Sequence, residues 1–407
     1  MRVLFTVSAW PTHYASMIPM GWALQAMGHE VRVLCPPSQA AQLTGAGLIP
    51  VPVPAGMDVV TRNCLQYYQE AVTGIFPFPW LPLHPVTREP MTSLADFDVE
   101  DYRRTVEPEL ARETGRGCDA AVGFARRWRP DVVVHDPTSL EGLLAAKVCG
   151  VPAVLSLWGP VGTDELAHNQ VVPNDFSGAF PRYGFGEFST AMIEHVVDPC
   201  PAPLAPRTKA NRLPVRYVPY NGCAPAPDWL LEPVRRPRVC LTWSTALATM
   251  IGPAAGLLPH LLAVLSEMDC EVVVTATARD LTGLGPVPSS VRVLERLPLH
   301  LLLPSCAAVV HHGGSGTAMT ALCAGVPQLA ITFLAETTLT GARLAAAGAG
   351  RHLMGHEATA TAVHDGVAAL LASPRYRVAA GHLAAEIRLR PTMADLVHDL
   401  EKLAVPA

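Results

Sequence analysis

A short segment in the second half of the chain combines two histidines with a glycine turn. It reads His311-His-Gly-Gly-Ser-Gly-Thr317, after the apolar residues 306–310 and before an apolar helical pattern. A strand that runs into a glycine turn and opens a helix leaves backbone N–H groups at the positive end of the helix dipole, where an anion binds. The segment predicts a phosphate-binding turn, with close approach at Gly313, Gly314 and Gly316 and hydroxyl donors at Ser315 and Thr317.

Other interpretations of this segment are weaker. It lacks the closing glycine of the G-x-S-x-G nucleophile turn, and no obvious acid and base follow in the usual order, which disfavours a hydrolase. The adjacent His311 and His312 would point in different directions and have no Cys or carboxylate ligands nearby, so no metal site is predicted. A turn whose glycines only redirect the chain stays an alternative.

A second group of candidate residues follows two predicted strands of the first half. His13, in Ser8-Ala-Trp-Pro-Thr-His13, comes after the strand predicted at 3–7, and Asp136 comes after the strand predicted at 131–135. If these strand ends are neighbours, the Asp136 carboxylate would hold and polarise the His13 imidazole, as an acid orients a histidine base. His135 is the alternative partner, and a structural role is the alternative for His13.

Composition limits the class of protein. A length of 407 residues favours two domains, and a hydrophobic content of one half is enough to form buried cores. The net charge of −5 with 16% charged residues disfavours a nucleic-acid partner. The ten cysteines form no Cys-x-x-Cys pair and indicate buried thiols in a reduced compartment. With too short an apolar run for a signal peptide and no window of about 18 apolar residues, we expect a cytoplasmic protein without membrane insertion.

Strand and helix patterns alternate in both halves. Strands are predicted at 3–7, 31–34, 131–135 and 153–157, and again at 239–243, 272–275, 291–294, 307–310 and 328–332. Helices are predicted between them, including 140–149, about 253–268 and one from about 316, with further helices near 359–404. This order gives right-handed βαβ units and an α/β fold class with two doubly wound, Rossmann-like domains, whose ligand binds at the carboxyl ends of the strands. Residues 54–115 are expected to form long loops and variable helices, and the prolines of 198–237 mark a crossing between domains.

Several motifs together carry a resemblance to a known family. The segment 309–328, with Gly341-Ala-Arg-Leu-Ala-Ala-Ala-Gly-Ala-Gly350, is similar to the donor-binding signature of actinobacterial natural-product glycosyltransferases of the GT-B fold. The likeness extends over nearly the whole chain, and it is greatest to the enzymes that transfer deoxysugars from dTDP donors to polyketide aglycones. The further matching segments are Arg2-Val-Leu-Phe5, Pro11-Thr-His13, 26–33, 130–134, Leu157-Trp-Gly-Pro160, Val218-Pro-Tyr-Asn-Gly222 and Pro227-Asp-Trp-Leu230.

The resemblance implies a role for each matched residue. His13 would be the base for the acceptor hydroxyl, supported by Asp136. His312 and the turn Gly313, Gly314, Ser315, Gly316 and Thr317 would bind the donor diphosphate, with a second loop at Thr242, Trp243, Ser244 and Thr245. Leu297 would recognise the pyrimidine through its backbone, beside Arg296, which replaces a frequent aromatic residue and offers a guanidinium plane for stacking. Trp158, Glu336 and Thr337 are assigned to the sugar.

Sugar recognition departs from the family. Glu336-Thr337 stands in place of an Asp-Gln pair that holds sugar hydroxyls, and Thr340 stands in place of an Asn. Fewer polar anchors would suit a deoxygenated or amino sugar. Trp10, Phe76, Phe78 and Trp80 are predicted to line the acceptor pocket, and core packing is the alternative for the aromatic region 67–83.

The resemblance also implies an organisation and a reaction. Residues 1–205 would bind the acceptor, 206–237 would link the domains, 238–390 would bind the nucleotide sugar, and the helix of 391–407 would return to the first domain. The expected reaction is inverting transfer from a dTDP-sugar to a hydroxyl of a polyketide-type aglycone, with no metal and no cofactor besides the donor.

Other functions remain open in the sequence. They are a sugar-nucleotide epimerase of similar fold, a catalytically silent helper that binds sugar nucleotides, and a membrane-associated lipid glycosyltransferase. The lack of a Lys/Arg-rich amphipathic helix disfavours the last. A homodimer and a helper protein are both compatible with the sequence.

Overall fold

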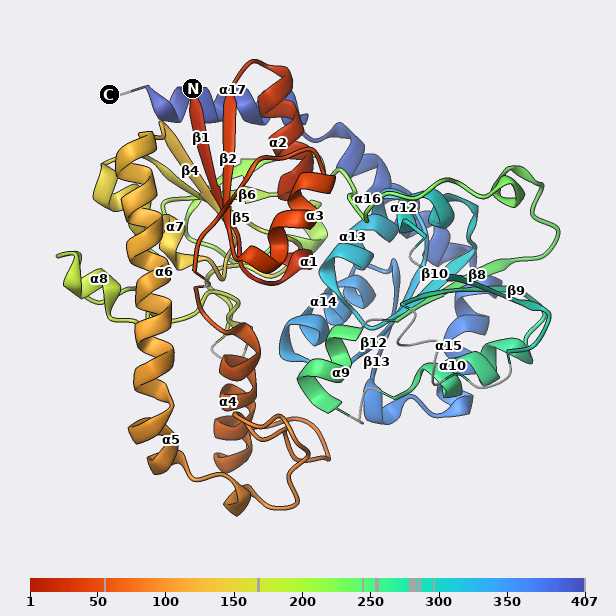
Figure 1. Cartoon of the computed structure of the whole chain (residues 1–407). Helices are drawn as coiled ribbons and strands as arrows, with labels where there is room; N and C mark the ends of the chain where they lie inside the picture. Colours follow the sequence, from red (N-terminus) through yellow and green to blue (C-terminus); the bar gives the residue numbers. More distant parts are fainter. Residues whose placement is uncertain are drawn as a thin grey trace.

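The computed structural model of the chain consists of two α/β domains, each built on a parallel sheet (Figure 1). It describes residues 1–54, 56–166, 169–243, 245–252, 256–277, 284, 287–295 and 297–405, without the side chains of residues 245 and 246. The predicted fold class is confirmed: both sheets have the doubly wound strand order in which the chain starts in the middle and works outward.

The first sheet has the strand order β3-β2-β1-β4-β5-β6-β7. Its central strand β1 pairs with β2 on one side and with β4 on the other, where Thr6 lies beside His135. Buried residues fill β1 and β4 on both faces, as central parallel strands require. The strands are β1 (Arg2–Thr6), β2 (Glu30–Cys35), β3 (Pro50–Pro52), β4 (Val132–His135), β5 (Ala153–Ser156), β6 (His195–Asp198) and β7 (Asn211–Pro214), the last within the proline-rich segment 206–237.

Helices cover both faces of this sheet. One face packs against α2 (Met17–Ala26), and the other packs against α6 (Glu107–Trp128) and α7 (Leu140–Cys149). In α6 the buried Cys118, Ala121, Val122 and Ala125 repeat at helical spacing, while the remaining face is charged. The stretch 54–115, expected to hold loops and variable helices, contains α4 (Val59–Val72), α5 (Val99–Thr105) and the first turns of α6. The other helices are α1 (Pro11–Tyr14), α3 (Ala40–Gly45) and α8 (Ala179–Arg182).

The second sheet has the strand order β10-β9-β8-β11-β12-β13. Its strands are β8 (Arg238–Thr242), β9 (Glu271–Ala276), β10 (Val291–Glu295), β11 (Ala308–His311), β12 (Gln328–Thr332) and β13 (Gly350–Met354). Around it lie α9 (Thr245–Ile251), α10 (Leu258–Ser266), α12 (Leu299–Leu302), α13 (Ser315–Cys323), α14 (Ala335–Ala346), α15 (Ala360–Ala372) and α16 (Pro374–Leu389).

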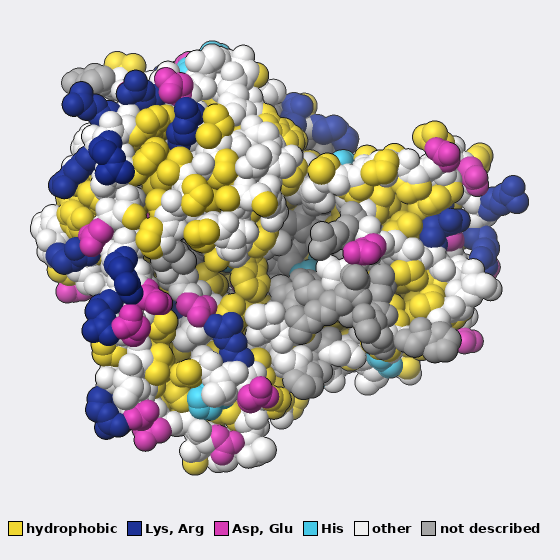
Figure 2. Space-filling view, in the orientation of Figure 1, with side chains coloured by type: hydrophobic (Ala, Val, Ile, Leu, Met, Phe, Trp, Pro, Cys, Tyr) yellow, Lys and Arg dark blue, Asp and Glu magenta, His cyan; other side chains and the backbone are white. Residues whose placement is uncertain are grey.

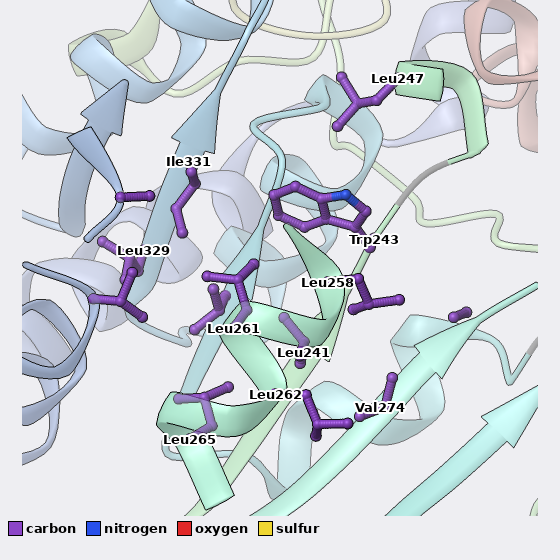
Figure 3. Packing of buried hydrophobic residues seen from close by; sticks show 14 of the residues in the cluster. Leu241, Trp243, Leu247, Leu258, Leu261, Leu262, Leu265, Val274, Leu329 and Ile331 are labelled. Atoms are coloured by element: carbon purple, nitrogen blue, oxygen red, sulfur yellow. The ribbon is translucent and has the colours of Figure 1, made fainter. Parts of the chain in front are cut away.

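A core of the second domain lies between one face of its sheet and α10. Figure 3 shows Leu261 and Leu265 of α10 packed with Leu241 of β8, Val274 of β9 and Ile331 of β12. The helix predicted at about 253–268 begins in the structure at Leu258, and residues 253–255 lie outside the described part. Leucines at positions i, i+3, i+4 and i+7 of this helix explain why it buries one face.

The C-terminal helix α17 (Met393–Ala404) packs on the first domain, near the N-terminus (Figure 1). Its buried residues Leu396, Val397 and Leu400 join the cluster that contains Val3 and Leu24. No helix within the described ranges has both the length and the apolar run needed to cross a membrane.

Basic side chains gather at the outer edge of the first domain in the view of Figure 2, on the side where Figure 1 places α6. Basic residues of and beside α6 pair with its acids: Arg116 lies 3.2 Å from Glu109, and Arg182 of α8 lies 2.8 Å from Asp119. This edge is therefore a mixture of both charges along a solvated helix face.

A buried ion pair joins the two domains. The loop after β5 carries Glu165, whose carboxylate oxygens lie 2.9 and 3.1 Å from the two terminal nitrogens of Arg343 in α14. The Glu165 side chain is 3% exposed and that of Arg343 is 17% exposed. Arg343 also donates to the carbonyl oxygen of Pro160 in the same loop. The loop after β5 is thus fixed against the second domain.

Candidate active site

The first half of the site lies at the carboxyl edge of the first sheet, where β1 and β4 are neighbours. Asp136 directly follows β4, is fully buried, and accepts hydrogen bonds from the backbone N–H groups of Ser8 (2.6 Å) and Thr138 (2.8 Å) and from the Thr138 hydroxyl (2.8 Å). Burial raises the pKa of Asp136, and these hydrogen bonds oppose the rise. His13 lies in the short helix α1 that follows β1.

Thr138 connects the two predicted partners. Nδ1 of His13 lies 3.3 Å from the Thr138 hydroxyl and 3.5 Å from that of Ser8. Because the Thr138 hydroxyl donates its proton to Asp136, its oxygen must accept from an Nδ1–H of His13. The predicted direct contact between Asp136 and His13 is therefore replaced by a bridge through Thr138, and Nε2 of His13 keeps a lone pair that can accept a proton.

A tryptophan covers one face of this histidine. The ring centroids of His13 and Trp158 are 4.0 Å apart, and the ring planes differ by 14°. Burial lowers the pKa of His13 from 6.5 to about 3, so the imidazole is neutral at neutral pH. His135, the alternative partner of Asp136, is fully buried and directs its Nδ1 to the Asp136 carbonyl oxygen at 3.0 Å, as a packed residue of the strand end.

The second half of the site is the turn between β11 and α13. Gly313 has a φ of +84°, and a Cβ atom there would lie 2.6 Å from Cγ2 of Thr332. At Gly314 a Cβ would lie 2.5 Å from Nε2 of His312, so this position must be glycine for the His312 ring to lie against the turn. The first hydrogen bond of the helix runs from Ala318 N–H to the Gly314 carbonyl, which leaves the N–H groups of Ser315, Gly316 and Thr317 outside the helix ladder.

The two adjacent histidines have different environments. His311 is fully buried, and its Nδ1 accepts a hydrogen bond of 3.1 Å from the Gly313 N–H, which holds the turn. His312 is partly exposed and lies edge-on to Trp243, with ring centroids 6.2 Å apart. Burial lowers the pKa of His312 to about 4. His312 is therefore neutral and lies beside the helix start, whereas His311 holds the turn.

One carboxylate joins the two halves. Oε1 of Glu336, at the start of α14, accepts from the indole N–H of Trp158 and from the hydroxyl of Ser315, both at 2.9 Å. The three residues come from the two domains, so the face that covers His13 is connected to the first residue of α13. Trp158 and Glu336, both assigned to the sugar, are thus brought together with Ser315 of the glycine turn, and His13 is stacked on Trp158.

The other residues assigned to the sugar have local partners. The Thr337 hydroxyl donates to the Leu334 carbonyl and accepts from the Leu334 N–H, which caps α14. The Thr340 hydroxyl donates to the Glu336 carbonyl at 3.1 Å and lies 3.4 Å from that of Ser315. Thr337 thus uses its hydroxyl to hold a helix start, and the structure does not bring it to Trp158.

The remaining donor-site predictions fall at the same edge or outside the described part. Thr242 ends β8 beside His311 and is buried, and Leu297 is buried in the cluster with Leu299 and Leu302. Thr245 begins α9, and its side chain is not described. Ser244 and Arg296 lie outside the described residues.

The aromatic residues predicted for the acceptor form a row between the domains. Phe76, Phe78 and Trp80 contact one another in sequence, with Phe78 stacked on Trp80 at 4.8 Å between ring centroids. Trp80 continues the row to Phe333 of the second domain at 6.0 Å. Trp10 lies 6.0 Å from His13 and also packs against the core cluster of the second domain. Trp10 is therefore the member of this set that lies beside His13.

Sequence reasoning missed two residues of the site. Ser8 and Thr138 hold Asp136 and His13, and both lie within five residues of a predicted site residue, at strand ends. Hydroxyl residues directly after a predicted parallel strand were the available signal. In the part of the chain that the structure describes, no group of three or more His, Cys, Asp or Glu side chains could hold a metal ion.

Comparison with known proteins gives consistent matches over nearly the whole chain. Residues 22–244 and 259–403 match the N-terminal and C-terminal domain models described as erythromycin biosynthesis protein CIII-like. The chain is 34% identical to tylactone mycaminosyltransferase of Streptomyces fradiae, over 99% of this chain and 92% of that protein.

Two solved structures have the same fold. The glycosyltransferase VinC in complex with dTDP has a TM-score of 0.76 at 27% identity, covering 99% of each chain. The spinosyn rhamnosyltransferase SpnG complexed with spinosyn aglycone has a TM-score of 0.77 at 29% identity, covering 98% of this chain and 100% of that chain.

Proposed function

The chain belongs to the erythromycin biosynthesis protein CIII-like family of natural-product glycosyltransferases, and we propose that it transfers a deoxy- or amino sugar from a dTDP-sugar to a hydroxyl of a polyketide-type aglycone with inversion. The observation that carries the proposal is the bridge from His13 through Trp158 and Glu336 to Ser315. It connects a neutral histidine of one domain to a phosphate-binding turn of the other.

In the proposed reaction His13 is the general base. Its Nε2 takes the proton of the acceptor hydroxyl while the acceptor oxygen forms a bond to the anomeric carbon of the sugar. Asp136 and Thr138 support this role, because they hold the proton of the neutral imidazole on Nδ1 and stabilise the imidazolium that forms. General base assistance of this kind contributes about 10² to 10⁴ in rate.

The leaving group is dTDP, and we propose that the N-terminal end of α13 stabilises its negative charge. As the bond between the anomeric carbon and the diphosphate breaks, negative charge develops on the diphosphate oxygens. The N–H groups of Ser315, Gly316 and Thr317, the helix dipole and His312 are the proposed donors. A preorganised donor of this type contributes on the order of 3 kcal/mol to transition-state stabilisation. With this set of donors we propose that no metal is required.

The matched proteins support the choice of substrates. Tylactone mycaminosyltransferase is named for sugar transfer to tylactone, the spinosyn rhamnosyltransferase was solved with spinosyn aglycone, and VinC was solved with dTDP. We assign acceptor binding to residues 1–205, with Trp10 beside the base, and donor binding to residues 238–390. Residues 206–237 contain β7, the edge strand of the first sheet, and then continue to the second domain, and the helix α17 packs on the first domain.

A donor and acceptor screen tests the proposal. We expect dTDP to raise the melting temperature more than UDP, and a dTDP-deoxysugar with a macrolactone or aromatic polyketide alcohol to give a product of the added sugar mass in the presence of EDTA. The anomeric configuration of that product, measured by NMR, should be opposite to that of the donor. His13→Ala should lower kcat by about 10² to 10⁴, and Asp136→Ala should lower it less.

Three results would reject the proposal or redirect it. An isomerised sugar nucleotide formed without acceptor would indicate an epimerase. Binding of dTDP with no transfer to any acceptor would indicate a silent helper. Unchanged turnover of an alcohol acceptor by His13→Ala would remove His13 as the base.

A further inference from the structure

Trp158 touches both halves of the site, and its contacts give it a role besides sugar binding. We propose that Trp158 is a positioning residue that aligns the His13 imidazole only when the donor-binding domain is closed against the first domain. The inference rests on the proposed function, because it requires His13 to act as the base.

On the first domain, the indole fixes the plane of the base. Its ring lies 14° from parallel to the imidazole at 4.0 Å, while the Thr138 hydroxyl holds Nδ1 from the edge. The contact with the indole on the ring face and the contact with the hydroxyl at the ring edge together restrict the imidazole to one orientation.

On the second domain, the same indole is held by a single hydrogen bond. Its N–H donates to Oε1 of Glu336, which also accepts from Ser315. Trp158 is 5% exposed, so an indole N–H without this partner would be a buried donor left unpaired. The orientation of the indole therefore depends on where α14 lies.

The backbone beside Trp158 fits the same arrangement. A Cβ atom at Gly159 would lie 2.5 Å from the Cβ of Ser315, so the loop approaches the start of α13 only because this residue is glycine. Arg343 lies two turns after Glu336 on α14 and holds the loop again at Glu165 and at the Pro160 carbonyl. One face of α14 thus contacts the first part of the loop at Trp158, Pro160 and Glu165.

Because of these contacts, Trp158 aligns the His13 imidazole only while the two domains are in contact. If the domains separated, Glu336 and Arg343 would leave the loop together, and the indole would lose the partner that keeps it flat on His13. Two charged groups are connected to the imidazole through one intervening residue each: Asp136 through Thr138, and Glu336 through Trp158. Neither touches the imidazole directly, so both act through the residue that lies between.

A double-mutant cycle tests the coupling. Trp158→Phe keeps an aromatic face and removes the N–H, and Glu336→Ala removes the acceptor. We expect each to lower kcat about tenfold, as for the loss of a hydrogen bond to a charged group, and the double variant to lose no more than either single variant. Multiplied effects of the two substitutions would overturn the proposal, because a Glu336 that only holds the sugar would act independently of Trp158.

The pH profile of kcat gives a second readout that a purely structural role would not move. Burial lowers the pKa of His13 to about 3, and Trp158→Ala would admit water to the imidazole and return its pKa toward 6.5. We expect Trp158→Ala to lose activity as the pH falls below about 6.5, where the wild type does not. An acid limb identical to that of the wild type would contradict the proposal.

Trp22→Phe is the matched control. Trp22 also donates its indole N–H, to the Ala46 carbonyl at 2.7 Å, but lies on α2 and is 41% exposed. It should keep the wild-type kcat and pH profile. His13→Ala separates the two proposals: if it retains full activity, the base assignment fails, and if it is inactive while the Trp158 variants match the wild type, only the positioning role fails.

Discussion

Asp136 reaches His13 through the hydroxyl of Thr138, which lies 2.8 Å from the Asp136 carboxylate and 3.3 Å from Nδ1 of His13. A hydroxyl has one proton, so the direction of this chain is determined: His13 donates to Thr138, and Thr138 donates to Asp136. The buried carboxylate thereby sets the tautomer of a ring that it does not touch.

Thr138→Val should show how much this bridge contributes. The substitution keeps the shape of the side chain but leaves Nδ1–H of His13 without its nearest acceptor. We expect kcat to fall about 10- to 100-fold with little change in acceptor KM, whereas Thr138→Ser should stay within about twofold of the wild type. Equal kcat values for the valine and serine variants would show that the hydroxyl has no role in catalysis.

The folding stability of the protein should decrease as the pH is lowered, because several histidines are buried in the neutral form in the folded state. Burial lowers the pKa of His135 to about 4 and that of His311 to about 3, both below the value of 6.5 in an unfolded chain. Between these values the unfolded state binds more protons, so the stabilisation is complete above pH 6.5 and is lost as the pH falls toward the folded pKa. At pH 5 the loss is about 2 kcal/mol for each such histidine.

Urea unfolding at pH 7 and pH 5 measures this loss. His135→Asn keeps a donor for the Asp136 carbonyl but cannot take up a proton, so its midpoint should change less between the two pH values than that of the wild type. A variant with the same pH dependence as the wild type would assign the acid sensitivity to other groups.

Two glycines of the donor turn should respond in opposite ways to alanine. Gly313→Ala places a Cβ at positive φ and 2.6 Å from Thr332, so it should destabilise the protein by more than 1 kcal/mol and abolish dTDP binding. Gly316 lies in the first turn of α13, and the nearest neighbour of a Cβ there is 4.0 Å away. Gly316→Ala should therefore keep or raise the melting temperature by the gain in helix propensity.

The dTDP affinity of Gly316→Ala then reports on the turn itself. If a phosphate lies against the backbone of Gly316, the added methyl group should weaken dTDP binding at least tenfold in a protein that is fully folded. Wild-type affinity in a calorimetric titration would place the diphosphate away from this residue.

Replacing only Arg343 of the ion pair with Glu165 should destabilise the protein more than replacing both residues. Arg343→Met leaves a buried carboxylate without its partner and should cost about 3–5 kcal/mol of unfolding free energy. Arg343→Met combined with Glu165→Gln removes the uncompensated charge and keeps an acceptor for the Gly162 and Arg207 N–H groups, so it should recover much of that loss. Arg116→Ala, at an exposed pair, should change stability by about 0.5 kcal/mol or less.

Local signals were sufficient for part of the site. The turn at Gly313, Gly314 and Ser315 could be predicted because a buried strand, a glycine pair and a helix start are adjacent in the chain, and each is visible in residue types. The positions of His13 and Asp136 followed from the rule that parallel strands present their carboxyl ends at one edge. The fold class followed from the same alternation of strands and helices.

Other features depended on packing between distant segments. Trp158 and Glu336 are 178 residues apart, and their hydrogen bond exists because the loop after β5 docks on α14. No periodicity or motif specifies which donor a buried carboxylate will meet. Likewise, Thr337 was assigned to the sugar from its place in a motif, but its hydroxyl caps its own helix.

The sequence by itself therefore determined the two sheets, the sheet edges at which the candidate site lies and the glycine turn before α13, because these depend on residues close together in the chain. The tertiary structure decided that Thr138 lies between Asp136 and His13, and that Trp158 and Glu336 connect His13 to that turn. Such contacts are set by how two domains fit against each other, and that fit depends on side chains of both domains at once.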